Sequence, residues 1–386
     1  MSSKAAPNLS STEVDALAKK GRQAHEKGHF REAIESQLQV VNHYAATGRP
    51  NADASKLLCL YFYGLKDYNS AATILKQLTE LFPEDPDNFE NLGVVMRKLH
   101  RIPEAVQNLE RAVKMAPDKA NIHDALTHSY GQLGNREKCR QHGRLSLQIK
   151  DRESLAPGIR HPVPETPPPP FSHKENNIIS FSLWGKNPRY LTGAIRNARL
   201  IPDIYPGWKC RVYHDNSVPD ETLEELRSLQ SELISMASSK NFFDGLFWRF
   251  LPATDKETDR FLIRDIDSVV NVKERVAVDE WLDSDKYFHV MRDYFSHSEL
   301  ILAGMWGGVG GVLPSLNQLL SEFKPNVKAT ETYDQLFLRL AVWPTISQSI
   351  LIHDSAFDTP GSIPFPKYGN LPPGKHIGQN EAAVRD

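Results

Sequence analysis

Small and apolar positions recur at a fixed interval of 34 residues in the first part of the chain. Ala71, Ala105 and Cys139 are successive members of one such series, and Pro83 and Pro117 form a second series with the same spacing. A period of this length is typical of stacked helix pairs, because a single pair cannot bury its apolar face without neighbours. The prolines fall where the second helix of a pair should end, since proline cannot continue the helical hydrogen bonding.

The helical period is expected to extend over residues 1–150, and the segment 151–175 has a different character. Six of the ten residues in 161–170 are prolines. Such a run favours the extended polyproline II conformation, which forms a semi-rigid spacer. We interpret residues 151–175 as a linker to a second domain at 176–386. A ligand for an SH3- or WW-type domain is the alternative.

The second domain alternates short apolar runs of β type with segments of helical periodicity. This alternation is typical of a Rossmann-like α/β domain, in which helices cover a mostly parallel sheet. The predicted fold class is therefore an all-α solenoid followed by an α/β domain. The expected strands are 178–183, 209–214, 261–265, 287–291 and 350–353, and the expected helices are 188–199, 221–229, 272–282, 313–323 and 333–342.

Polar side chains stand at or just after the ends of the predicted strands. In an open α/β sheet ligands bind at the carboxyl ends of the strands, so these side chains are expected to share one region. The central pair is Asp265 and Asp267, whose carboxylates lie on one face of a strand and can approach one hard divalent cation. A bare Asp-x-Asp also occurs by chance at solvated strand ends. The other strand-end residues are Ser182, Trp184, His214, Asp215, Arg292, Asp293 and His353.

Composition narrows the classes of function. A net charge of −2 lacks the basic field of a nucleic-acid-binding protein. The three cysteines are far apart and show neither a disulfide framework nor metal-ligand spacing, which favours a reducing compartment. The sequence shows no apolar run of membrane-spanning length and no signal-peptide pattern. We expect a cytoplasmic protein whose main partner is not nucleic acid.

One repeat unit carries Phe89, Leu92 and Gly93, followed by Ala105 and Leu109. These residues and their spacing resemble the tetratricopeptide repeat, and the resemblance covers roughly residues 14–150. It implies a curved scaffold that binds peptide segments or mediates self-association. We expect an acceptor protein, peptide or glycan in its groove, and a homodimer is a further expectation.

Four short motifs follow one another in the C-terminal domain, at Phe247–Pro252, Arg264–Ser268, Phe288–Asp293 and Ala303–Gly308. This ordered series resembles glycosyltransferases of the GT-A type found in bacterial polysaccharide-related proteins, over roughly residues 177–380. The resemblance implies a UDP- or GDP-sugar donor and a Mn²⁺ or Mg²⁺ ion held by the Asp-x-Asp. Such an ion neutralises charge on a diphosphate leaving group.

Specific roles follow from this resemblance and from the chemistry of the side chains. The metal ligands are expected to be Asp265, Asp267 and His353, although His353 could instead be a hydrogen-bonded residue at a strand end. The glycine-dense stretch from Gly304 is expected to form a loop under the sugar. Residues expected to contact the donor are Ser182, Trp184, Gly185, Arg249, Arg264, Asp265, Gly304, Trp306 and Gly307.

Two carboxylates are candidates for catalysis, Asp334 and Asp293, because an inverting transfer needs a base for the acceptor hydroxyl. For Asp334 the alternative is a structural role in the first turn of a predicted helix. Trp184 could equally be a core residue, and Arg249 a buried ion-pair partner. The stereochemistry of transfer is left open.

The sequence therefore predicts a metal-dependent, hexosyltransferase-like enzyme with a tetratricopeptide array. The alternative is a non-catalytic interaction scaffold that carries a degenerate transferase domain. A metal-dependent phosphohydrolase is a third hypothesis, but such enzymes usually supply more His and Asp ligands than this chain shows.

Overall fold

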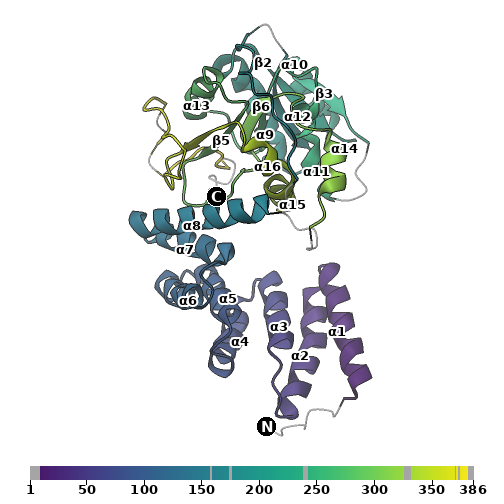
Figure 1. Ribbon diagram of the computed structural model, residues 1–386. Coiled ribbons are helices and arrows are strands. Elements are labelled where there is room, and N and C mark those ends of the chain that lie inside the picture. The colour runs from purple at the N-terminus through teal and green to yellow at the C-terminus, as the bar shows by residue number, and fades with distance from the viewer. Residues whose placement is uncertain are drawn as a thin grey trace. The chain divides into compact units, whose positions relative to one another are not determined.

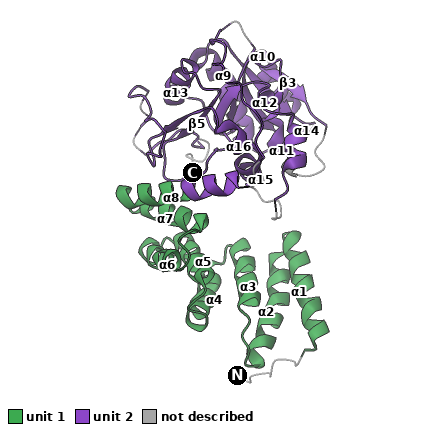
Figure 2. Ribbon diagram, in the orientation of Figure 1, with its two compact units in different colours: residues 1–146 green, residues 147–386 purple. Residues whose placement is uncertain are grey.

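Figure 1 shows the computed structural model of the protein, which describes residues 9–156, 159–173, 176–237, 242–325, 332–369, 371–372 and 374–380. The chain divides into two compact units, residues 1–146 and residues 147–386 (Figure 2). The division falls inside one helix, α8 (Arg136–Leu155).

Unit 1 is a row of antiparallel helix pairs with the repeat predicted from the sequence. Helix α1 pairs with α2, α3 with α4 and α5 with α6, and α7 continues the row. The repeated small residues Ala71 and Ala105 are fully buried. A Cβ at Gly93 would lie 2.5 Å from Leu109 Cγ, so the close approach of α5 and α6 requires glycine there. The helices are α1 (Ser11–Glu26), α2 (Phe30–Ala46), α3 (Ala52–Gly64), α4 (Tyr68–Leu81), α5 (Pro86–Lys98), α6 (Ile102–Met115) and α7 (Ala120–Gln132).

Unit 2 is built on a mixed seven-stranded sheet with the strand order β3-β2-β1-β4-β6-β5-β7. Strand β6 runs antiparallel to β4 and β5, and the other neighbouring pairs are parallel. Strands β1 and β4 are buried along their whole length, as expected for central strands covered on both faces. The strands are β1 (Asn177–Leu183), β2 (Trp208–His214), β3 (Glu232–Ser235), β4 (Arg260–Arg264), β5 (Phe288–Arg292), β6 (Met305–Val309) and β7 (Ile350–Asp354).

Helices pack on this sheet (Figure 1). Helix α9 lies against β1 and β2, and α13 lies against β5. The predicted helix at 333–342 continues as one π-helical turn at Leu338–Val342 and a further short helix. The helices are α9 (Pro188–Ile204), α10 (Asp220–Ser228), α11 (Phe242–Trp248), α12 (Leu251–Thr254), α13 (Val272–Leu282), α14 (Leu316–Glu322), α15 (Tyr333–Phe337) and α16 (Trp343–Ile346).

The glycine-dense stretch that the sequence predicts as a loop is a strand. It forms β6, which pairs with β4 on one side and β5 on the other. A Cβ at Gly307 would lie 2.6 Å from Leu262 Cδ2, and one at Gly308 would lie 2.9 Å from Phe261 Cζ. These glycines therefore make room for side chains of the neighbouring strand.

The predicted linker is part of unit 2. Its first residues complete α8, where Asp151 Oδ1 accepts a hydrogen bond from Trp343 Nε1 at 2.6 Å. Further along, the His161 amide donates to Thr345 Oγ1 at 3.2 Å, and the Pro169 carbonyl accepts from Arg260. The proline-rich stretch is thus held against unit 2 instead of forming a free spacer.

Across the described residues, every helix is either too short or too polar to cross a lipid bilayer.

Candidate active site

A cavity of about 490 Å³ opens at the carboxyl ends of β1 and β4. Strand order reverses at β1, because β2 and β3 follow on one side and β4 returns to the other. Open α/β sheets bind ligands in the crevice at such a reversal. The lining residues are Ser182, Leu183, Trp184, Arg189, Tyr190, Leu246, Arg249, Asp265, Ile266, Asp267, His297, Leu302, Ala303, Gly304, Met305, Thr332, Asp334, Gln335 and Gly378.

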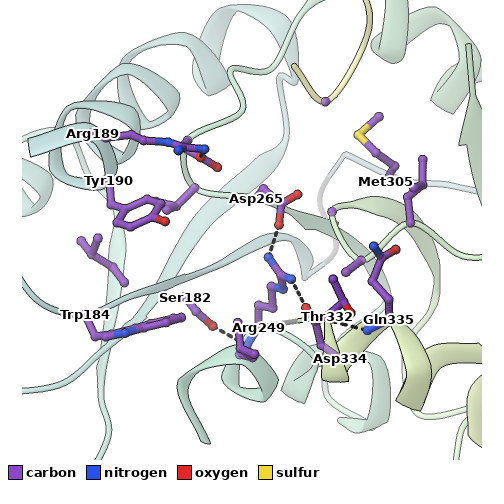
Figure 3. A pocket seen from close by; sticks show the side chains of 18 of the residues that line it. Ser182, Trp184, Arg189, Tyr190, Arg249, Asp265, Met305, Thr332, Asp334 and Gln335 are labelled. Carbon is purple, nitrogen blue, oxygen red and sulfur yellow. Dashed lines mark hydrogen bonds and ion pairs between the residues drawn. The ribbon is translucent and has the colours of Figure 1, made fainter. Parts of the chain in front are cut away.

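Arg249 bridges two carboxylates in this cavity (Figure 3). One guanidinium nitrogen pairs with Asp265, and the other donates to Asp334 Oδ2 at 2.7 Å. The Arg249 amide donates to Ser182 Oγ at 2.9 Å, which ties α11 to the end of β1. The Nε atom of Arg249 is buried without a hydrogen-bond partner. Three groups therefore hold Arg249, and its Nε–H is a donor without a hydrogen-bond partner.

The charges of Arg249, Asp265 and Asp334 affect one another's protonation. Burial opposes the charge of Arg249, but Asp265 and Asp334 outweigh it and raise the pKa of the guanidinium. Burial also raises the pKa of Asp334, with the carboxylate of Asp265 adding to the effect and Arg249 opposing it. A buried carboxylate with a raised pKa is a better proton acceptor than a solvated one.

A second arginine neutralises the other member of the Asp-x-Asp. Arg189 pairs with Asp267 from the first turn of α9. The Arg189 side chain is 44% exposed, whereas that of Asp267 is only 12% exposed. The carboxylate is therefore fixed, and the arginine has room to turn toward a ligand.

The walls of the cavity combine aromatic rings with one position that has to be glycine. Trp184 and Tyr190 lie on the same side, near the end of β1 (Figure 3). Trp184 meets Trp248 edge to face, with ring centroids 6.1 Å apart. A Cβ at Gly304 would lie 2.5 Å from Asp265 Cγ, so glycine there leaves space for the carboxylate.

These residues fit a hard divalent cation. Asp265 and Asp267 offer carboxylate oxygens, the ligands that Mg²⁺ and Mn²⁺ prefer, from a single turn after β4. The space beside Asp265 is one that any side chain at position 304 would fill. In this structure both carboxylates carry arginine partners, so a cation would have to displace them.

Four predicted donor contacts lie away from the cavity wall. Arg264 is buried on the other face of β4, where it pairs with Glu274 at 3.3 Å and donates to the Ile263 carbonyl. Trp306 is buried within β6, and Gly307 packs beside it against β4. Gly185 donates its amide to Ser217 Oγ at 2.6 Å. The expected roles of these four in donor binding do not fit their positions.

Two further predicted residues belong to other parts of the sheet. His353 is buried on β7, with His289 at 2.8 Å on Nδ1 and Glu280 at 2.9 Å on Nε2, so both ring nitrogens are engaged. Strands β6 and β5 separate it from β4, and it is not in reach of the Asp-x-Asp. Asp293 pairs with Lys273 at 2.7 Å and does not line the cavity. The structure thus gives His353 a structural role and removes Asp293 from the catalytic candidates.

Sequence reasoning missed several residues of the cavity wall. Arg189 and Tyr190 open the helix that follows β1, and a helix start after a strand is a signal for anion binding that could have found them. His297 follows the strand-end Asp293 by four residues. Gly378 comes from the last part of the chain and carries no sequence signal.

Comparison with known proteins gives partial matches, one of them to a protein named for its TPR repeats. No protein-family description matches the chain. The TPR repeat-containing thioredoxin TTL4 of Arabidopsis thaliana is 30% identical over 93 residues, which are 24% of this chain and 14% of that protein. The human N-alpha-acetyltransferase 25, NatB auxiliary subunit, is 27% identical over 140 residues, 32% of this chain and 14% of that protein. The chain thus spans about a seventh of the length of these relatives.

Two solved structures are similar to parts of the chain. MamA matches with a TM-score of 0.33 and 19% identity, over 36% of this chain and 80% of that one. A mutant of the Thermobaculum terrenum O-GlcNAc transferase matches with a TM-score of 0.41 and 19% identity, over 68% of this chain and 47% of that one.

Proposed function

We propose that the protein is a metal-dependent glycosyltransferase that transfers a sugar from a nucleoside-diphosphate donor to an acceptor hydroxyl. The observation that carries the proposal is the cavity at the carboxyl ends of β1 and β4, where Asp265, Asp267 and Asp334 converge with two arginines. A GT-A-type domain remains part of this proposal. Three carboxylates with cationic partners suit a ligand that carries both phosphate and hydroxyl groups.

The proposal assigns a role to the aromatic and charged residues of the cavity. Trp184 and Tyr190 offer ring faces to a base or sugar. Arg189 turns from Asp267 to the diphosphate, which its exposure allows. A Mn²⁺ or Mg²⁺ ion bound by Asp265 and Asp267 would neutralise charge on the leaving group. Asp334, held by Arg249, accepts the proton of the acceptor hydroxyl.

The helical repeats of unit 1 are proposed to recruit the acceptor. Stacked helix pairs form extended concave surfaces that bind peptide segments. The groove between α3 and α5 combines the exposed Leu60 and the half-buried Tyr63 with Lys56 and Asp53. A protein or peptide acceptor with mixed apolar and charged character fits such a surface.

The proposal is tested by calorimetric titration of the full-length protein with UDP- and GDP-sugars, with and without Mn²⁺. We expect saturable binding of at least one donor that depends on Mn²⁺. The Asp267→Asn variant should bind that donor at least tenfold more weakly, because one metal ligand loses its charge. Mass spectrometry of the same mixtures detects released nucleotide.

The matched control is Asp203→Asn, which changes an exposed aspartate at the far end of α9. This variant should bind the donor as the parent does. Absence of binding by every donor, or equal binding by parent and Asp267→Asn, would contradict the proposal.

One observation favours the alternative of a non-catalytic scaffold. Asp265 and Asp267 already pair with Arg249 and Arg189, so both carboxylates of the Asp-x-Asp have cationic partners without a metal ion. If the protein shows no Mn²⁺-dependent donor binding but unit 1 still captures a peptide partner, the scaffold is the better description.

A further inference from the structure

A second group of potential metal ligands lies at the end of β5. Asp293 follows this strand directly, His297 comes four residues later, and His376 arrives from the last described part of the chain. One ligand atom of each residue lies within 4.8 Å of the others. None of the three belongs to the proposed donor machinery of Asp265, Asp267 and Asp334.

Only one of the two carboxylate oxygens of Asp293 accepts hydrogen bonds from the protein. Its Oδ2 accepts from Lys273 Nζ at 2.7 Å and from the Ile377 amide at 3.2 Å. Its Oδ1 is buried without a hydrogen-bond partner and lies 3.4 Å from His297 Nδ1. The Asp293 side chain is 1% exposed, so water does not satisfy this oxygen. A buried acceptor without a partner is costly unless another group binds it.

The two imidazoles present lone pairs suited to an ion. His376 Nδ1 lies 2.7 Å from the Ile377 carbonyl, which can only accept, so this nitrogen carries the proton and Nε2 keeps its lone pair. Metal-binding histidines commonly donate the N–H of their second nitrogen in this way. His297 Nδ1 accepts a hydrogen bond from the Asp293 amide at 3.2 Å, so its lone pair lies beside Asp293, and an ion would have to replace this hydrogen bond.

Ring packing fixes the orientation of the cluster. Tyr294 stacks on His376 with centroids 4.1 Å apart and an interplanar angle of 14°. His297 and His376 meet almost at right angles, with centroids 4.9 Å apart. Both imidazoles are therefore held by the fold, which reduces the entropy that ion binding would cost.

We propose that Asp293, His297 and His376 bind one divalent cation of the zinc class, and that this ion fastens the C-terminal segment to the end of β5. Two imidazoles and one carboxylate are a common ligand set for Zn²⁺. Ligands at about 2.1 Å from a tetrahedral ion lie roughly 3.5 Å apart. Asp293 Oδ1 and His297 Nδ1 are already 3.4 Å apart, and all three ligand atoms lie within 4.8 Å of one another. His297 and Gly378 also line the cavity, so the ion would sit at its rim.

Lys273 limits the affinity of this cluster for a divalent cation. Its ammonium group pairs with Asp293 Oδ2 and leaves Oδ1 for the ion, but its charge opposes a second cation nearby. We expect weaker binding than at a closed structural zinc site, and tighter binding in a Lys273→Met variant.

The test is titration of the chelator-treated, full-length protein with Co²⁺, a visible-absorbing substitute for Zn²⁺. We expect a d–d absorption band that saturates at one Co²⁺ per chain bound to this cluster and that added Zn²⁺ removes. His376→Gln and His297→Gln should each weaken Co²⁺ binding at least tenfold. The matched control His173→Gln, which changes an exposed histidine of the same unit, should not alter it.

Asp267→Asn separates this proposal from the proposed function. If the band survives in Asp267→Asn and is lost in His376→Gln, the ion binds at the end of β5 whatever the enzymatic activity. If the parent shows no band, or if His376→Gln and His297→Gln both retain it while folded by circular dichroism, the proposed ion site is wrong. Loss of the band in Asp267→Asn alone would also overturn it and would place the ion at the Asp-x-Asp.

Discussion

The glycine at position 304 determines the shape of the cavity beside Asp265, because any larger residue would fill that space. Glycine there leaves the carboxylate of Asp265 against the backbone of the chain entering β6. The absence of a Cβ matters more than backbone freedom, because this glycine does not have a positive φ angle. Gly304 is therefore a residue of the candidate site although it has no functional group.

We predict that Gly304→Ala weakens Mn²⁺-dependent donor binding at least tenfold. The new Cβ would lie 2.5 Å from Asp265 Cγ, so the carboxylate has to leave its place. Calorimetric titration measures the effect. Gly307→Ala, whose Cβ would meet Leu262 instead, is the contrasting variant and should lower thermal stability by about 1–3 kcal/mol while sparing donor affinity in the folded protein. Equal donor affinity in Gly304→Ala and the parent would contradict the prediction.

Neighbouring residues of β4 explain which side chains could be assigned from the sequence. Asp265 and Asp267 line the cavity as the strand-end pattern predicts. Arg264 points to the opposite face, where Glu274 neutralises it. The alternation of faces along a strand already implies that Arg264 and Asp265 lie on opposite sides. Arg249 could not be placed from its local sequence, because its partners come from the turn after β4 and from α15.

Strand β6 is an element that the sequence pattern does not predict. Its glycines have the composition of a turn, yet the two neighbouring strands need their small size. Strand β3 was missed for another reason, since it has four residues and is only half buried. Strands β1, β2 and β4 were predictable because each combines apolar β-forming residues with a buried core face.

Two buried histidines and a partly exposed glutamate link β5, β7 and α13. His289 Nε2 and His353 Nδ1 are 2.8 Å apart, and His353 Nε2 lies 2.9 Å from Glu280 Oε2. Burial lowers the pKa of His353, and burial together with His353 lowers the pKa of His289 well below its ordinary value of 6.5. Protonation of either ring is therefore less favourable in the folded protein than in the unfolded chain.

We predict that unit 2 loses stability as the pH falls below about 6.5. The unfolded chain then binds protons that the folded chain excludes, which costs about 1.4 kcal/mol per histidine for each pH unit below that value. Urea unfolding followed by tryptophan fluorescence at pH 7.5 and 5.5 measures the loss. His289→Gln should show a smaller loss than the parent. An identical loss in parent and variant would mean that other groups cause the acid sensitivity.

The two units can be followed separately in the intact protein. All six tryptophans lie between residues 184 and 343, so tryptophan fluorescence reports on unit 2 alone. The described residues of unit 1 form helices α1 to α7 and the first part of α8, so far-ultraviolet circular dichroism reports on these helices together with the helices of unit 2. A change seen by dichroism but not by fluorescence therefore belongs to unit 1.

We predict that Gly93→Val destabilises unit 1 by about 1–3 kcal/mol, because it forces α5 and α6 apart where they cross. The dichroism transition should move to lower temperature while the fluorescence transition stays in place. Asn91→Ala, an exposed position on the same helix, is the matched control. Donor binding should be unchanged in both variants, and a parallel fall in the fluorescence transition would show that the units unfold together.

The antiparallel strand β6 also limits the length of molecule that can bind at both strand ends. It separates β4 from β5 by two strand spacings, or about 10 Å. A compact anion such as inorganic phosphate can reach Asp265 or the end of β5, but not both. An extended molecule, in which a diphosphate is joined to a ring, is long enough to reach from one to the other. The strand order thus favours elongated ligands before any side chain contributes to recognition.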